Sequence, residues 1–237
     1  MSSIEVMINN YLGNSTYFAI VMSLAYYMLG IVLKRKFKLA IFSPLIVASV
    51  LTIATIVIFH IDMEVYNSAG NYISFMLTAA TVCYGILLYE ELNVLKTHFK
   101  AIMIGILVGI AITMCSILAL SILFRLPHDQ YVSLLPKNIT TAIGLSVSEA
   151  NGGVPSITIV WILITGNLGN AIAEPVIKFF KIDDPVARGV AIGSSSHAVG
   201  TAKALEIGEI EGAISGLSLA VTGLLSVVVA AVFAQLY

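Results

Sequence analysis

The sequence contains few charged residues: they make up 11% of its 237 positions, against 59% for apolar residues. A soluble domain typically carries about 25% charged residues, so this chain has too few to cover the surface of a water-soluble globule. Its formal net charge of −1 offers no basic surface to phosphate groups, which argues against a nucleic-acid partner. The composition excludes a soluble enzyme and a disordered chain, and it predicts a polytopic membrane protein.

Cysteine is also scarce, with two residues in the whole chain. Cys83 and Cys115 each lie inside an apolar run, and no metal-ligand spacing surrounds them. We therefore expect two buried free thiols, and neither a disulfide scaffold nor a metal site. The zinc motif H-E-x-x-H, the phosphate-binding motif G-x-x-x-x-G-K-[ST] and the serine-hydrolase elbow G-x-S-x-G are missing too, so we expect no cofactor and no enzyme activity.

Long apolar runs, by contrast, are abundant. A helix needs about 20 mostly apolar residues to cross about 30 Å of hydrocarbon. Five runs near or above that length contain no charge, and a sixth contains only Glu174, close to its end. The predicted spans are Leu12–Leu33, Leu39–Phe59, Tyr72–Tyr89, Ala101–Phe124, Ile157–Ile177 and Ala213–Leu236.

Basic residues flank these runs unevenly. In a six-span arrangement, ten of the 12 Lys and Arg residues fall on one side of the membrane and two on the other. Because Lys and Arg in loops favour the cytoplasm, we expect the first side to be cytoplasmic and both termini to lie outside. The ten are Lys34, Arg35, Lys36, Lys38, Lys96, Lys100, Lys178, Lys181, Arg188 and Lys203, and the two are Arg125 and Lys137.

Two polar inserts, residues 127–156 and 182–212, interrupt the apolar pattern. The spans around them begin near positions 101, 157 and 213, a step of 56 residues. Within the inserts, Ala142-Ile143-Gly144 is followed 56 positions later by the similar Ala198-Val199-Gly200. This spacing predicts an internal repeat. We divide the chain into an N-terminal three-helix membrane region, residues 1–100, and a C-terminal region, residues 101–237, within one integral membrane domain.

Three arrangements are open to the inserts: surface loops, complete crossings, or segments that dip into the membrane and return. Loops longer than about 12–15 residues are usually functional or disordered, and complete crossings would move Lys178, Lys181 and Arg188 outside. We therefore predict an all-α polytopic membrane protein with about six transmembrane helices and two re-entrant or broken-helix inserts. Because the two units then have opposite topology, they form an inverted repeat, with which many secondary transporters build a midplane substrate site.

The inserts carry residue types that suit an anionic ligand. A broken helix presents unpaired N–H groups with partial positive charge, which bind carboxylates and phosphates. Glycine lets the backbone approach a ligand, hydroxyls donate hydrogen bonds, and lysine, arginine or histidine supplies positive charge. The residues that we expect to bind substrate are Lys137, Thr140, Thr141, Arg188, Ser195, Ser196, His197, Gly200, Thr201 and Lys203.

These residues also have structural interpretations. The serines at 194–196 can permit close helix packing, and His197 can be a hydrogen-bonded structural residue. Lys203 and Arg188 can be solvated residues of the cytoplasmic face. Glu174 marks either a pathway or the membrane interface, because it stands at the end of a span. Similarly, Gly105 and Gly109 allow close contact of helices, either within the chain or between copies.

At the inserts the sequence resembles the LrgB/CidB family of bacterial membrane proteins. The resemblance covers essentially the whole chain and is most specific in its second half. The family often has Gly-Pro where Glu174-Pro175 stand here. The segments that carry the resemblance are Leu135–Ile143, Gly152–Pro155, Asp184–Gly189, Gly193–Ala204 and Glu211–Ser215.

The resemblance implies two functions. In the first, antiholin-like or holin-like proteins act with a small LrgA/CidA-type membrane partner to modulate murein hydrolase activity, autolysis and programmed cell death. In the second, the pair transports small carboxylates such as pyruvate across the cell membrane, and a related domain occurs in the plant plastidic glycolate/glycerate transporter. The chemistry of the inserts favours transport of a small monocarboxylate, and we also expect homo-oligomers in the lipid bilayer.

Overall fold

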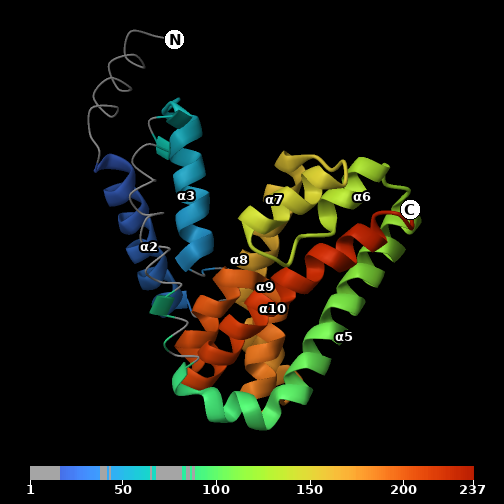
Figure 1. Ribbon diagram of the computed structural model, residues 1–237. Helices are drawn as coiled ribbons and strands as arrows, with labels where there is room; N and C mark the ends of the chain where they lie inside the picture. Colours follow the sequence, from blue (N-terminus) through green and yellow to red (C-terminus); the bar gives the residue numbers. More distant parts are fainter. Residues whose placement is uncertain are drawn as a thin grey trace. The chain divides into compact units, whose positions relative to one another are not determined.

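The computed structural model describes residues 17–37, 42, 44–64, 66–67, 82–83, 86 and 89–237. The chain divides into two compact units, Met1–Cys83 and Tyr84–Tyr237. Over the described residues the fold consists of eight helices without any strand (Figure 1). Four of them, α2, α5, α8 and α10, are long and apolar enough to cross a membrane, which agrees with the all-α membrane class predicted from the sequence.

The first unit pairs α2 (Phe18–Phe37) with α3 (Pro44–Ile58). Tyr26 Oη and Thr55 Oγ1 are hydrogen-bonded at 2.7 Å, and a Cβ added to Gly30 would lie 2.7 Å from Pro44 Cα, so only glycine permits this approach. With 15 residues, α3 is about 22 Å long and thus shorter than an ordinary span. The predicted span Tyr72–Tyr89 falls almost entirely outside the described residues.

Three long helices frame the second unit: α5 (Leu92–Phe124), α8 (Pro155–Phe179) and α10 (Glu209–Phe233). They correspond to the last three predicted spans, although α5 begins earlier and takes in Lys96 and Lys100. Tyr237 Oη donates to the carbonyl oxygens of Ser121 at 3.3 Å and Leu126 at 2.8 Å. The end of the chain therefore lies beside the end of α5 (Figure 1).

The first insert folds into α6 (His128–Leu134) and α7 (Thr141–Ala150), joined by a turn. Ser133 Oγ accepts a hydrogen bond from Val154 N at 2.7 Å, and a Cβ on Gly144 would lie 3.4 Å from the Pro136 carbonyl oxygen. The chain thus reverses between the two helices. Residues 128–150 are called the first hairpin, and residues 135–140 are its tip.

The second insert forms α9 (Pro185–Ile207), which is interrupted by non-helical backbone at Ser196 (φ −132°, ψ 16°) and His197 (φ 41°, ψ −147°). Ile192 and Ala204 pack in one cluster with Ala173 of α8, whereas a continuous helix would hold these two residues about 18 Å apart. The chain therefore turns back at residues 196–197. Residues 185–207 are called the second hairpin, and residues 194–198 are its tip.

A hydrophobic core joins α5, α10 and the first hairpin. It includes one face of α5, on which residues such as Ile106, Ile110 and Met114 recur at helical spacing. Cys115 follows Met114 by one position, a rotation of about 100° that places it on the exposed face of α5. Cys83 is exposed too, so the prediction that both thiols are buried was wrong, whereas both are free as expected.

Candidate functional site

The tips of the two hairpins meet inside the second unit. Asn138 Nδ2, from the first tip, donates to Thr113 Oγ1 of α5 at 3.0 Å and to the carbonyl oxygen of Ser194 at 3.5 Å. Asn138 and Ser194 are 56 residues apart, which is the spacing of the repeat predicted from the sequence. Equivalent positions of the two inserts are therefore in contact.

A groove of about 340 Å³ lies between α8 and the first half of α9. Lys137 of the first tip lines it together with Ser195 and Ser196 of the second tip, and most of its other lining residues are apolar. Ser195 Oγ and Ser196 Oγ lie 3.0 Å apart, and among the described residues no carboxylate forms an ion pair with Lys137. An ammonium and two hydroxyls in an apolar groove suit a small anion with an apolar part.

A second groove, of about 530 Å³, lies between α5 and the first half of α9. It extends from Asp184, at the base of the second hairpin, to Ser195 at the tip. Ser195 lines both grooves, so the first half of α9 separates them. Gly105 and Gly109 face Val190 and Ser194 of α9. A Cβ at Gly105 would lie 3.0 Å from Val190 Cγ1, so packing within the chain favours a glycine there, whereas a Cβ at Gly109 would make ordinary contact with Ser194 Oγ at 3.4 Å.

The family model for LrgB-like proteins matches residues 23–236. The chain belongs to the LrgB-like family. This finding confirms the resemblance that the inserts carry, and the matched region contains both hairpins. LrgB-like proteins are membrane proteins, in agreement with the four long apolar helices, and they are not known as enzymes. No solved structure gives a significant match.

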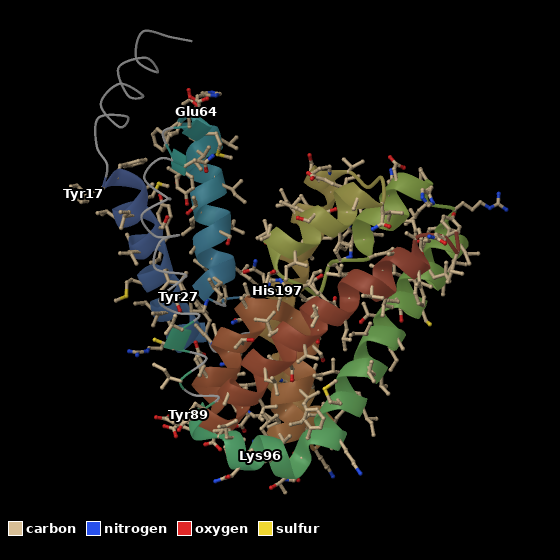
Figure 2. All side chains as sticks on the ribbon, in the orientation of Figure 1. Tyr17, Tyr27, Glu64, Tyr89, Lys96 and His197 are labelled. Atoms are coloured by element: carbon tan, nitrogen blue, oxygen red, sulfur yellow. The ribbon has the colours of Figure 1, made fainter. Side chains whose placement is uncertain are left out.

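His197 occupies a structural position in this LrgB-like chain. Its side chain is 5% exposed, and its Nε2 lies 2.9 Å from the carbonyl oxygen of Ile162 on α8 (Figure 2). A carbonyl oxygen only accepts hydrogen bonds, so Nε2 carries the hydrogen. Gly166 lies beside the ring, where a Cβ would be 2.4 Å from His197 Cε1. The bond to Ile162 holds the second tip against the middle of α8, and His197 does not line either groove.

The neighbouring tip residues stabilise the turn. Thr201 Oγ1 donates to the His197 carbonyl oxygen at 3.1 Å and lies 2.9 Å from Ser215 Oγ on α10. Gly200 is required for the reversal, because a Cβ there would lie 2.4 Å from Ser196 Cβ. In the first hairpin, Thr140 at the end of the tip is the N-cap of α7, and Thr141 is the exposed first residue of that helix. Neither threonine lines either groove.

Two predicted cations lie at the base of the second hairpin rather than at its tip. Lys203 Nζ is 2.5 Å from Glu174 Oε1 of α8 and 2.8 Å from Glu206 Oε2, and its side chain is 7% exposed. Arg188 Nη1 is 3.3 Å from Glu211 Oε1 of α10. Lys203 is therefore buried and not solvated, and the two cations tie the hairpin to α8 and α10.

Sequence reasoning did not select two residues that the structure brings to the candidate site, Asn138 at the first tip and Trp161 on α8. Asn138 lies within the segment that carries the family resemblance, and its offset of 56 from Ser194 was the available signal. Trp161 lines the smaller groove, but its position within the apolar run of α8 gave no indication of a role there. The structure thus assembles the candidate site from Lys137, Ser195 and Ser196, and assigns His197, Thr201 and Lys203 to holding the hairpin.

Proposed function

We propose that this LrgB-like protein carries a small monocarboxylate such as pyruvate across the bacterial cytoplasmic membrane, together with an LrgA/CidA-type partner. The groove shared by Lys137, Ser195 and Ser196 carries the proposal. The carboxylate pairs with the single ammonium, which favours one carboxylate over two. A short apolar tail packs against side chains of α8 such as Ile172.

The serine hydroxyls are available to such a ligand. Ser195 Oγ donates to the carbonyl oxygen of Ala191 at 2.7 Å in the present structure, and Ser196 Oγ lies against it. Each hydroxyl has one hydrogen that rotates about the Cβ–Oγ bond, so it can turn from its internal acceptor to a carboxylate oxygen. The exposed side chain of Ser195 allows this rotation.

The membrane arrangement proposed with this function has six spans and two re-entrant hairpins that enter from opposite faces, as an inverted repeat. In its support, the base of the first hairpin contacts the start of α8 through Ser133 and Val154. The base of the second hairpin contacts the other end of α8, where Arg188 Nε donates to the Ile182 carbonyl oxygen at 2.7 Å. The two bases therefore lie at opposite ends of one long helix.

The basic-residue asymmetry orients this arrangement, with the base of the second hairpin in the cytoplasm and both termini outside. A cysteine introduced at Lys36 should then be protected from an impermeant thiol reagent added to intact cells. Labelling of that cysteine from outside would contradict the orientation. A cysteine at Arg125, on the opposite side in this arrangement, is the matched position that should be labelled.

Substrate binding is measurable through Trp161, the one tryptophan of the chain, because it lines the groove. In the purified full chain, pyruvate, lactate or glycolate should change its fluorescence saturably. Lys137→Met should weaken binding by about tenfold or more, since a hydrogen bond to a charged group contributes about 1.5–3 kcal/mol. Lys36→Met removes a basic residue of the other unit and should bind like the natural protein.

Uptake of the same labelled acids into proteoliposomes, with and without the partner, tests transport itself. Saturable uptake that Lys137→Met abolishes and Lys36→Met keeps would support the proposal. Absence of saturable uptake for every small carboxylate, together with intact modulation of autolysis in cells, would favour an antiholin-like regulator of murein hydrolases instead.

A further inference from the structure

Two hydroxyl side chains on α10 are buried without a hydrogen-bond partner. Ser218 is 0% exposed and Thr222 is 1% exposed, and neither side-chain oxygen has a partner within the described part of the chain. Several helical hydroxyls in the unit donate to the carbonyl oxygen one turn earlier, as Ser194 does to Val190 at 2.7 Å and Ser116 to Ile112 at 2.6 Å. Among the described residues, Ser121 on α5 is a further buried hydroxyl without a partner, but it stands alone, whereas Ser218 and Thr222 are one turn apart on one helix. Because a buried hydroxyl without a partner is destabilising, a ligand that contacts these two oxygens is favoured.

These hydroxyls lie level with the hairpin tips. The first half of α9 and the start of α10 run in the same direction, since Gly189 faces Ile214 and Gly193 faces Ser215. One further turn of α10 brings Ser218 level with the second tip. On the far side, Gly223 faces Ile143 of the first hairpin. Ser218 and Thr222, four residues apart on one face of α10, thus lie between the two hairpins.

The tips supply further oxygen ligands at this level. The first half of α9 ends there, and residues 135–140 of the first tip lie between α6 and α7 as non-helical backbone, so carbonyl groups of both segments have no intrahelical N–H partner. The end of the first half of α9 also carries the negative end of its helix dipole. In broken-helix transporters, such half-helix C-termini and unwound carbonyls coordinate the coupling cation.

We propose that the side-chain oxygens of Ser218 and Thr222, together with carbonyl oxygens of the two tips, bind a sodium ion. Neutral hydroxyl and carbonyl ligands suit a monovalent cation, whereas calcium sites in proteins characteristically include carboxylates. The bound ion holds the two tips together. The coupling role rests on the proposed function: sodium then assembles the carboxylate groove, and its gradient drives uptake.

Thermal unfolding of the purified full chain, without any carboxylate, tests the binding step. At constant ionic strength, replacement of choline chloride by NaCl should raise the unfolding temperature saturably, because a ligand that binds only the folded state stabilises it. In choline chloride, the double variant Ser218→Ala/Thr222→Val should unfold at the same temperature as the unmodified protein or at a higher one. Its apparent affinity for sodium should be at least tenfold weaker. Ser116→Ala, which removes an exposed hydroxyl on α5, should keep the full sodium response.

Two outcomes would overturn the proposal. Equal unfolding temperatures in choline, potassium and sodium chloride would show that ionic strength alone acts on the protein. A double variant that is destabilised equally in both salts would show that the hydroxyls are structural or hold only water. The sodium response should persist in Lys137→Met. A failed carboxylate titration beside an intact sodium response would therefore count against the transport proposal and not against the sodium site.

Discussion

The two hairpins share a shape but are anchored differently. At the base of the second hairpin, the anchors are ion pairs: Arg188 with Glu211, and Lys203 with Glu174 and Glu206. The first hairpin is held by neutral hydrogen bonds, and within the described residues no ion pair involves positions 128–150. These bonds are Tyr131 Oη to the Phe233 carbonyl oxygen at 2.7 Å, Val154 N to Ser133 Oγ at 2.7 Å, and Thr158 Oγ1 to Ser148 Oγ at 2.7 Å.

Because of this difference, the position of the second hairpin should depend on charge pairing, whereas the position of the first hairpin should not. A neutral hydrogen bond contributes modestly and responds little to its electrostatic surroundings. A buried ion pair gains little over apolar packing, but it becomes strongly destabilising when one partner is lost. We therefore expect the first hairpin to keep its position independently of charge. The second hairpin, which separates the two grooves, should keep its position only while its cations are paired with carboxylates.

The largest expected effect comes from removing both carboxylates that face Lys203. Glu174→Gln/Glu206→Gln leaves an almost fully buried ammonium without a negative partner. We expect a loss of about 3–5 kcal/mol of folding stability, measured by thermal or denaturant unfolding in mild detergent. Lys203→Met in the same background should restore much of the loss, because it removes the uncompensated charge.

Lys178→Ala is the control for this change. Lys178 also pairs with Glu174, at 3.5 Å, but its side chain is 78% exposed, and exposed ion pairs contribute about 0–1 kcal/mol. A double glutamine variant no less stable than Lys178→Ala would contradict the view that buried charge pairing anchors the second hairpin.

A smaller effect distinguishes the two turns at equivalent positions. A Cβ on Gly200 would lie 2.4 Å from Ser196 Cβ and 3.3 Å from the Ile192 carbonyl oxygen, so the tip must shift. A Cβ on Gly144 would meet first Ile162 Cδ1 at 2.6 Å, the mobile end of a side chain. We expect Gly200→Ala to cost about 1–3 kcal/mol. Gly144→Ala should be near neutral, since the helix propensity of alanine offsets a mild contact.

Unfolding measurements on the two alanine variants, with Trp161 fluorescence as a readout of the groove, decide this comparison. Gly200→Ala should also alter the fluorescence, because Ser196 lines the same groove. Equal destabilisation by both substitutions would show that the two turns are equally tight.

The long helices of the second unit were predictable because each is a local property of the sequence. Apolar runs of span length predicted α5, α8 and α10 to within a few residues, apart from the start of α5. That helix extends past the apolar run to Leu92, since its first turns contain good helix formers such as Leu95 and Lys96. The repeat spacing was also readable, and it anticipated the pairing of Asn138 with Ser194.

The assignment of side chains within the candidate site depended on contacts between distant segments. Lys203 was predicted to bind substrate because it follows a glycine-rich stretch, but its pairing with Glu174 arises only when the second hairpin folds back along α8. His197 contacts the Ile162 carbonyl oxygen and lines neither groove, and both this contact and the positive φ of its backbone arise from the reversal at the second tip. Tertiary reversal thus decides which polar residues line the grooves and which contact other elements of the fold.

The smallest expected effect concerns the neutral anchor of the first hairpin. Tyr131 is fully buried, and its hydroxyl donates to the carbonyl oxygen of Phe233 at the end of α10. Tyr131→Phe keeps the ring and its edge-on contact with Tyr237 while removing one hydrogen bond, so we expect a loss of about 0.5–1.5 kcal/mol. Because no charge is involved, the loss should be the same at low and high salt, whereas exposed partners such as Glu206 make the second base sensitive to screening. Unfolding of Tyr131→Phe and of Glu174→Gln/Glu206→Gln across a salt series measures this contrast. A salt-dependent loss of stability in Tyr131→Phe would show that the first hairpin, too, relies on charge.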